Sequence, residues 1–231
     1  MRLVLLIVLF FSSLSLAFES RGESFDEYVT ILYNDLDLEK ENLSYDVLWY
    51  ALLGRGNLTN AFYGLIDDRF LTIIDYSKSS NKKRMYVIDL EDRTLLFRVF
   101  VAHAKNTGDQ FAKYFSNKPG SNKSSLGFYV TLNSYVGSHG NSLRLEGMEN
   151  GFNDNAFDRA IVMHGAEYVS QDFINRYGRL GRSLGCPAIP LDYVDSIIPL
   201  ISAGSVLFIY YPDRSYLTNS KLLKRIPASG F

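Results

Sequence analysis

The apolar residues change their spacing once along the chain. Between Ser24 and about Leu65 they recur at intervals of three and four residues, which predicts two amphipathic helices. Ser24 opens a Ser-x-x-Glu capping box for the first helix, and Ser44 is placed to cap the second. The helical pattern weakens at residues 54–56, where two glycines flank an arginine.

After Asp67 the pattern shortens to runs of a few residues, which is typical of strands. Polar turns between the first three runs predict two antiparallel hairpins. Only 168–177 and 191–201 return to helical spacing, and a polar connection rich in Gly and Asn covers 105–125. The expected strands are 70–76, 83–89, 94–103, 126–132, 142–145, 160–164 and 206–211. The pattern therefore predicts a mainly β fold behind a short N-terminal helical lead, and the aromatic content of 14% favours the same fold class.

The first residues form a pattern of their own. Arg2 precedes an unbroken apolar run over 3–11, and small residues occupy the cleavage-recognition positions before the expected cut. The apolar stretch ends at Leu16 and is shorter than the roughly 20 residues that span a bilayer, which disfavours an uncleaved anchor. We expect an exported chain that loses residues 1–17 as a signal peptide and has no stable membrane insertion afterwards.

The distribution of charge excludes several function classes. The formal net charge is −1, and the lysines and arginines are dispersed, whereas a nucleic-acid partner normally requires a basic face. Three scattered histidines and one thiol give no metal-ligand spacing. The sequence therefore predicts no nucleic-acid binding, no metal site and no cofactor.

Cys186 is the only cysteine in 231 residues. It cannot form a disulfide within the chain, and a solitary thiol in an exported protein must escape oxidation, which favours a chemical role. Gly181 and Gly185 allow backbone conformations that bring the sulfur and the amides against a substrate. A His-Gly pair, His164-Gly165, precedes this loop. We expect Cys186 to be a nucleophile.

Four segments of the chain carry a combined pattern: Ser-Leu-Gly-Phe-Tyr at 125–129, Ser-Leu-Arg-Leu at 142–145, Ile-Val-Met-His-Gly-Ala at 161–166 and Gly-Arg-Ser-Leu-Gly-Cys-Pro-Ala at 181–188. Together, and in this order, they resemble the murein L,D-transpeptidase catalytic domain, the YkuD-type family of cysteine peptidoglycan enzymes. The resemblance covers roughly 70–211. It implies a β-sandwich-like catalytic core, which we place at 67–231, behind an N-terminal helical segment at 18–66 that is not part of the shared pattern.

The resemblance also implies a reaction and a partner. Cys186 would attack the peptidoglycan stem-peptide bond between meso-diaminopimelate and D-alanine, and the thioester would pass to the amine of a second stem peptide or to water. His164 matches the imidazole that activates the thiol, and Gly165 matches the position whose carbonyl orients that imidazole. A free thiol needs such a neighbour because its pKa is about 8.5. The expected location is the periplasm or cell envelope of a bacterium.

The cysteine loop departs from the majority pattern of the family at two positions. Leu184 occupies the slot of a second histidine, and Pro187 begins the segment that would carry an arginine, so we interpret the chain as a branch with Ser-Leu-Gly-Cys-Pro. His139 is the candidate to replace the missing histidine, with a structural or surface role as the alternative. Because proline lacks an N–H, oxyanion donors must come from the amides of Gly185 or Cys186, or from a neighbouring strand.

Substrate carboxylates require cations, and a guanidinium can hold a carboxylate with two hydrogen bonds. Arg182 and Arg144 are the candidates for this role, and the alternative for each is a solvated surface arginine. Ser183, Gly185 and His139 complete the set of expected substrate-binding residues.

The sequence leaves the reaction itself open. Transpeptidation, L,D-carboxypeptidase activity and other peptidoglycan hydrolysis differ in whether an amine or water reaches the thioester. A non-catalytic wall-binding domain is a further alternative, because a fold alone does not fix a function.

Overall fold

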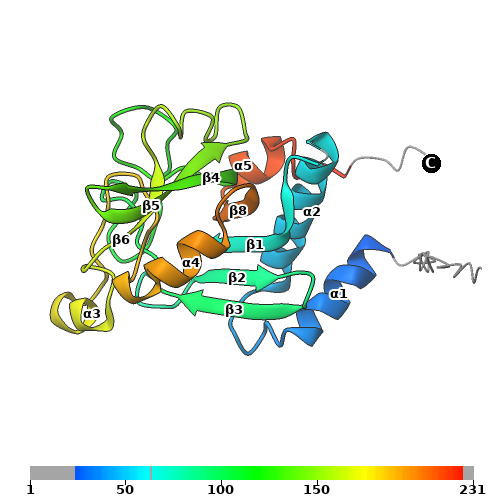
Figure 1. Cartoon of the computed structure of the whole chain (residues 1–231), viewed down its shortest axis with the longest axis horizontal. Helices are drawn as coiled ribbons and strands as arrows, with labels where there is room; N and C mark the ends of the chain where they lie inside the picture. Colours follow the sequence, from blue (N-terminus) through cyan, green and yellow to red (C-terminus); the bar gives the residue numbers. More distant parts are fainter. Residues whose placement is uncertain (1–23, 63, 226–231) are drawn as a thin grey trace, which may run out of the picture.

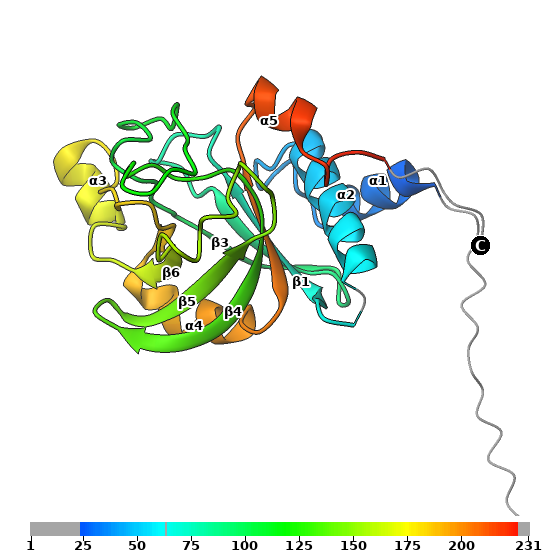
Figure 2. The same ribbon diagram turned by 90° about the horizontal axis from the view of Figure 1, so that it is seen from above.

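The computed structural model describes residues 24–62 and 64–225, so the expected signal peptide at 1–17 lies outside the described residues. The two predicted N-terminal helices are present as α1 (Phe25–Asp35) and α2 (Tyr45–Ala61). They lie beside β1 at one side of the molecule (Figures 1 and 2).

A local signal explains where α1 begins, and packing explains why α2 continues past its weak pattern. The amide of Glu27 donates a 3.2 Å hydrogen bond to Ser24 Oγ, as the capping box predicts. Ser44 precedes α2, but its side chain makes no capping hydrogen bond. The helix continues through the weak pattern at 54–56 because the residues beyond it, such as Leu58, are still buried in the core.

Among the described residues, eight strands form one sheet in the order β3-β2-β1-β8-β4-β5-β6-β7. The pairs β1·β8 and β6·β7 are parallel, and the other pairs are antiparallel, including the two predicted hairpins β1–β2 and β2–β3. The strands are β1 (Asp67–Asp75), β2 (Met85–Asp89), β3 (Thr94–Val99), β4 (Gly127–Gly137), β5 (Gly140–Gly147), β6 (Val162–Gly165), β7 (Ala188–Ile189) and β8 (Ser205–Tyr210). The seven expected strands are confirmed with shifted ends, and β7 is an addition.

The two ends of the sheet approach each other, which makes it barrel-like. Beyond the end of β3, Ala102 forms an antiparallel bridge with Ala188 of β7, and Ala104 forms a parallel bridge with Ser183. The run predicted as a strand to residue 103 therefore ends as regular β3 at Val99 but continues as a partner of the cysteine loop. The curvature is visible in Figure 2. The mainly β fold class is confirmed.

The remaining helices are short. α3 (Gln171–Tyr177) and α4 (Val194–Leu200), the latter after a 3-10 turn at Leu191–Tyr193, confirm the two later helical predictions. α5 (Arg214–Asn219) was not predicted, since six residues are too few to show a helical period. None of the helices in the described part of the chain is long and apolar enough to cross a membrane.

The helical lead shares the hydrophobic core of the sheet. Side chains of α1 and α2, such as Leu32 and Leu48, belong to the same buried cluster as Phe128 and Phe208 of β4 and β8. The helix approaches the sheet closely at Gly54 of α2, where a Cβ atom would lie 2.0 Å from the Phe128 ring. The Phe128 ring in turn stacks on Phe208 with centroids 4.2 Å apart.

Candidate active site

The parallel pairing of β6 with β7 brings Cys186 beside β6. His164 pairs with Ala188 and Gly165 with Ile189, so the cysteine, just ahead of β7, lies level with the start of β6. The Val162 amide donates to Cys186 Sγ at 3.5 Å. The thiol, 3.8 Å from the Ala160 carbonyl oxygen, is placed to donate to it.

His164 lies two residues further along β6 than Val162, whose backbone amide contacts the sulfur. His164 Nδ1 is 2.9 Å from the Gly165 carbonyl oxygen, so Nδ1–H donates to that oxygen. With the proton on Nδ1, Nε2 is the ring nitrogen that carries the free lone pair.

Burial lowers the pKa of His164, the Gly165 carbonyl opposes that shift, and the neighbouring His139 lowers the pKa further. Burial raises the pKa of the Cys186 thiol, and this is opposed by the Val162 amide, by the charge of Arg159 and by the amide of Cys186 itself. Both groups are therefore neutral at neutral pH in the resting site.

His139 lies in the hairpin between β4 and β5 and reaches the site. Its ring stacks on that of His164 with centroids 4.4 Å apart and an interplanar angle of 24°. His139 is exposed to solvent, whereas His164 is buried. The hairpin thus covers one side of the imidazole, and replacement of the missing second histidine by His139 stays a prediction.

Ser183 and the two glycines shape the loop around the thiol. Ser183 Oγ donates to the Cys186 carbonyl oxygen at 2.6 Å and accepts from the Gly185 amide at 3.2 Å. A Cβ at Gly185 would lie 2.5 Å from the Ile161 side chain, and one at Gly181 would lie 2.4 Å from Tyr168. Because the Gly185 amide already donates a hydrogen bond to Ser183 Oγ, the amide of Cys186 is the better placed of the two candidate oxyanion donors.

The two candidate arginines have different surroundings. Arg182 donates to the Gly108 carbonyl oxygen at 3.1 Å and forms an ion pair with Asp109 at 3.1 Å, so its guanidinium is engaged with the 105–109 loop. Arg144 is exposed, and its guanidinium lies over the Tyr135 ring, 4.5 Å from the centroid.

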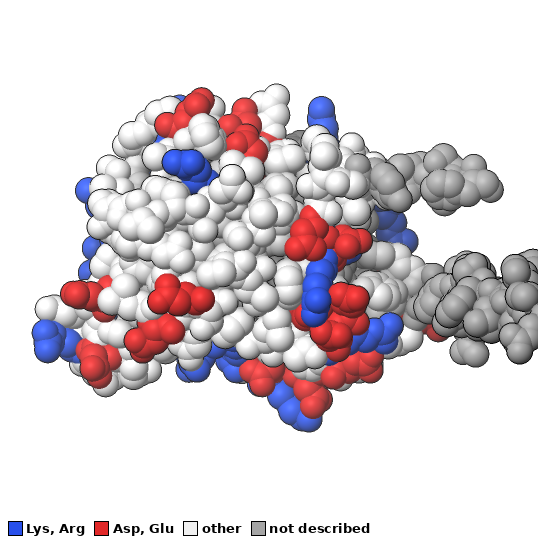
Figure 3. Space-filling model, viewed as in Figure 1, with Lys and Arg blue, Asp and Glu red and all other residues white. Residues whose placement is uncertain are grey.

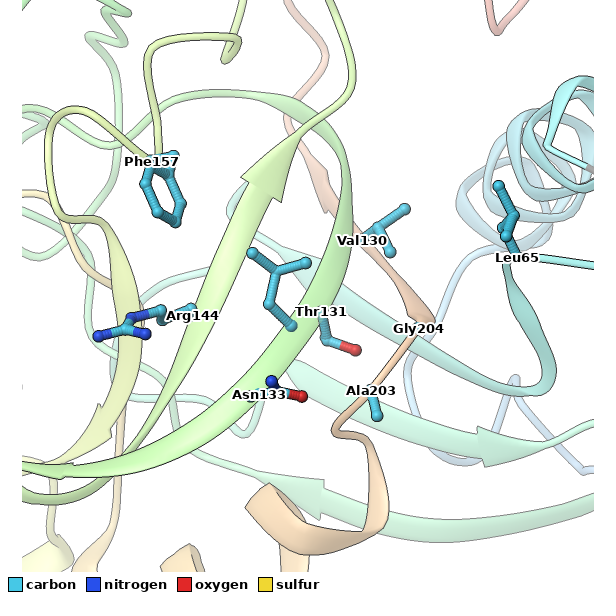
Figure 4. Close-up of a pocket in the computed structure, with 9 residues that line it drawn as sticks. Leu65, Val130, Thr131, Asn133, Arg144, Phe157, Ala203 and Gly204 are labelled. Carbon is cyan, nitrogen blue, oxygen red and sulfur yellow. The ribbon is translucent and has the colours of Figure 1, made fainter.

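Arg144 also shares a face of the sheet with His164. It pairs with Val162 across β5 and β6, and paired residues point to the same side. It lines a pocket of about 350 Å³ on this face together with Phe157, Val130 and others (Figure 4). Two strand spacings, roughly 10 Å, separate its backbone from that of Cys186.

The sequence pattern does not single out Arg159, Ser124 or Arg84. Ser124 Oγ lies 3.5 Å from the Gly185 carbonyl oxygen, to which it donates, and accepts from the Ala104 amide. Arg159 reaches the same loop from the turn before β6. No local spacing marks these residues, since their partners lie far away along the chain.

Comparison with known proteins identifies the family of the chain. A family model described as the L,D-transpeptidase catalytic domain matches residues 39–210, a range that begins inside the helical lead and not at residue 70 as the motifs indicated. A comparison with curated sequences gave no match.

Similar solved structures include an L,D-transpeptidase from Mycobacterium smegmatis, at 12% identity over 62% of this chain with a TM-score of 0.39. L,D-transpeptidase 3 from Mycobacterium tuberculosis is 14% identical over 62% of this chain and 61% of that chain, with a TM-score of 0.36. The enzyme from Xylanimonas cellulosilytica is 12% identical over 70% of this chain and 78% of that chain, with a TM-score of 0.34. The match spans 59% of the Mycobacterium smegmatis chain. Because the family model covers well over half of its residues, the present chain belongs to the L,D-transpeptidase catalytic domain family.

Proposed function

We propose that the chain is an exported, cysteine-dependent L,D-transpeptidase that acts on peptidoglycan stem peptides through a thioester. The observation that carries the proposal is the position of Cys186 beside β6, the strand that carries His164, together with the contact of the imidazole with the Gly165 carbonyl. This arrangement provides a nucleophile next to a base that is itself held by a third group.

The chemistry starts from a neutral thiol and a neutral imidazole. As Sγ attacks the carbonyl carbon of the residue before D-alanine, His164 takes the thiol proton on Nε2. The C–N bond then breaks, D-alanine leaves with that proton on its amine, and a thioester remains on Cys186. The amine of a second stem peptide attacks the thioester and releases the thiol, and attack by water gives the hydrolytic product instead.

The oxyanion formed in each step needs donors close to the sulfur. Pro187 has no N–H, and the Gly185 amide is bound to Ser183 Oγ. We assign the amide of Cys186 as the principal donor. This amide opposes the rise in the pKa of the thiol that burial causes, which supports the assignment.

Arg144 is the better candidate for the substrate carboxylates. It is exposed on the same face of the sheet as His164, and the described residues give it no carboxylate partner, whereas Arg182 is paired with Asp109. A stem-peptide carboxylate can therefore bind Arg144 without breaking an existing ion pair.

We further propose that residues 1–17 are removed on export and that the mature chain works in the cell envelope. In that division 18–66 forms the helical segment and 67–231 the catalytic domain. The formal net charge of −1 and the mixed signs of charge on the face in Figure 3 are consistent with a partner that is not a nucleic acid.

The test is incubation of the mature protein with tetrapeptide muropeptides, followed by mass spectrometry. Cross-linked dimers indicate transpeptidation, and tripeptide monomers indicate L,D-carboxypeptidase activity. Cys186→Ser should abolish either product and retain the melting temperature, because a serine hydroxyl is a far weaker nucleophile here. Undiminished turnover by a folded Cys186→Ala variant would refute the proposal, and binding to sacculi without any product would favour a wall-binding domain.

A further inference from the structure

Arg159 is an arginine in the turn before β6 whose guanidinium is almost fully committed to hydrogen bonds. One nitrogen, Nη1, donates to the Ser116 carbonyl oxygen at 2.9 Å and to Ser125 Oγ at 2.5 Å. The other, Nη2, donates to the Lys123 carbonyl oxygen at 2.6 Å and to Ser121 Oγ at 3.4 Å. The side chain thus gathers four points of the long connection that precedes β4.

The same guanidinium lies against the cysteine loop. A Cβ atom built on Gly185 would be 3.6 Å from Arg159 Nη2 and 3.8 Å from the Lys123 carbonyl oxygen. On its own side of the loop, the Ala160 carbonyl, next to Arg159 in sequence, accepts from Cys186 Sγ. Arg159 Nη2 therefore lies close to Gly185, the residue before the nucleophile, and the residue after Arg159 supplies the carbonyl that faces the thiol.

We propose that Arg159 is a positioning residue of the active site, which fixes the 116–125 connection against the cysteine loop and places a permanent positive charge beside Cys186. This inference rests on the proposed role of Cys186 as the nucleophile. Arg159 supplies a cation close to the cysteine, because the two residues that follow the cysteine, Pro187 and Ala188, carry no charge.

The other charged and titratable groups around the thiol do not supply this charge. Tyr76 and Tyr168 face the cysteine, but the pKa of each is raised to about 12, first by burial, so both are neutral at neutral pH. The pKa of His164 is lowered by burial, so it is neutral as well. The charge of Arg159 opposes the rise in the pKa of Cys186 that burial causes. Among the groups in the described part of the chain, Arg159 is therefore the one that bears a charge next to the resting thiol.

The experiment measures alkylation of the mature protein by iodoacetamide from pH 6 to pH 10.5, with intact mass as readout. One cysteine in the chain makes the modified residue unambiguous. The variants are Arg159→Gln, which removes the charge, and Arg159→Lys, which keeps the charge but cannot form all four hydrogen bonds of the guanidinium. Arg176→Gln, an exposed arginine in α3, is the matched control. Melting temperature is recorded for each.

We expect Arg159→Gln to shift the midpoint of the alkylation profile to higher pH and to slow the reaction at pH 7 roughly three- to tenfold, with an unchanged plateau at high pH. Arg159→Lys should keep the midpoint but lower the melting temperature, and Arg176→Gln should change neither. The inference is overturned if Cys186 in the Gln variant is alkylated with the same pH profile as in the wild type. It is also overturned if the alkylation rate of that variant is lower by the same factor at every pH. If the Gln variant does not fold, a Lys variant with the wild-type melting temperature overturns it.

These measurements need no peptidoglycan. Absence of muropeptide turnover by the wild type would therefore contradict the proposed function and leave the result on Arg159 standing. An unchanged alkylation profile together with full turnover would contradict the role of Arg159 alone.

Discussion

At the scale of single residues, the directions of two pKa shifts set how the site works. Burial raises the pKa of the Cys186 thiol above its ordinary value, and burial lowers the pKa of His164 below 6.5. A thiolate–imidazolium pair is therefore not the resting state. Proton transfer to His164 has to accompany the attack, so the imidazole acts as a general base in the reacting complex.

This state predicts a characteristic pH dependence. His164 must be neutral to accept the proton, and its lowered pKa keeps it neutral to below pH 6.5, so the acid limb of kcat/KM should lie below that value. His139→Ala removes a neighbour that lowers the pKa of His164 and should move the acid limb to higher pH. Measurement of kcat/KM between pH 4.5 and 9 checks both statements. An acid limb centred above pH 7 in the wild type would contradict the assignment of a neutral base.

The two candidate arginines lead to separable outcomes. Arg144→Gln should lower kcat/KM for tetrapeptide substrates roughly tenfold or more, the scale for hydrogen bonds to a charged group, with little change in stability. Arg182→Gln removes one of the two arginines that pair with Asp109, together with the hydrogen bond to the Gly108 carbonyl oxygen, and should lower the melting temperature. Reactivity of Cys186 with iodoacetamide serves as the common control, because this reagent has no carboxylate. Loss of turnover in the Arg182 variant alone, with normal stability, would return the carboxylate-binding role to Arg182.

At the scale of elements, α2 contains two glycines that differ in the space around them. Gly54 faces Phe128, whose ring is fixed between the helix and Phe208, and a Cβ there would lie 2.0 Å from the ring. Gly56 has no atom within 4 Å of the corresponding position. The helix thus uses one glycine for close packing, and the other has no packing role.

Substitution of each glycine by alanine should therefore change stability in opposite directions. Gly54→Ala forces the Phe128 ring to move and should destabilise the protein by about 1–3 kcal/mol. Gly56→Ala should stabilise it by about 0.5–1 kcal/mol, because alanine restricts the unfolded chain and favours the helix. Urea denaturation of the two variants and the wild type provides the comparison. Equal effects of the two substitutions would mean that α2 does not dock at Gly54.

At the scale of the whole molecule, a buried cluster connects the β1–β3 part of the sheet to the cysteine loop. Arg84, fully buried, donates to the Val101 carbonyl oxygen at 2.9 Å and lies 2.8 Å from His103 Nδ1, which must accept. The backbone carbonyl of His103 in turn accepts a hydrogen bond from the Ser183 amide. Burial, with the charge of Arg84, lowers the pKa of His103 to about 3.

This cluster predicts a loss of stability in acid. The unfolded chain binds a proton at His103 below about pH 6.5, whereas the folded chain does so only near pH 3, so stability is full above pH 6.5 and falls between these values. From pH 7 to pH 5 this histidine should contribute a loss of roughly 2 kcal/mol. The loss should be smaller in His103→Gln than in the wild type and unchanged in His139→Gln, as measured by urea denaturation at both pH values. Equal losses in all three proteins would contradict a neutral, buried His103.

The sequence by itself determined the features that are encoded in local spacing. The helical period located α1 and α2, short apolar runs located seven strands, and the lone Cys186 with the His164-Gly165 pair indicated the chemistry. These signals are local because a helix or strand buries one face at a fixed period, and because a nucleophile loop requires glycines next to the reactive residue.

Only the tertiary structure decided which distant residues complete the site. Arg159 bonds to groups 34 to 43 positions away, and Arg182 reaches Gly108, 74 positions away, so neither contact follows from spacing. Likewise, the difference between Gly54 and Gly56 depends on a ring that β4 supplies. Guanidinium contacts and close packing depend on the three-dimensional approach of separate elements, and that approach is fixed when the sheet curves and its ends meet at Ala102 and Ala188.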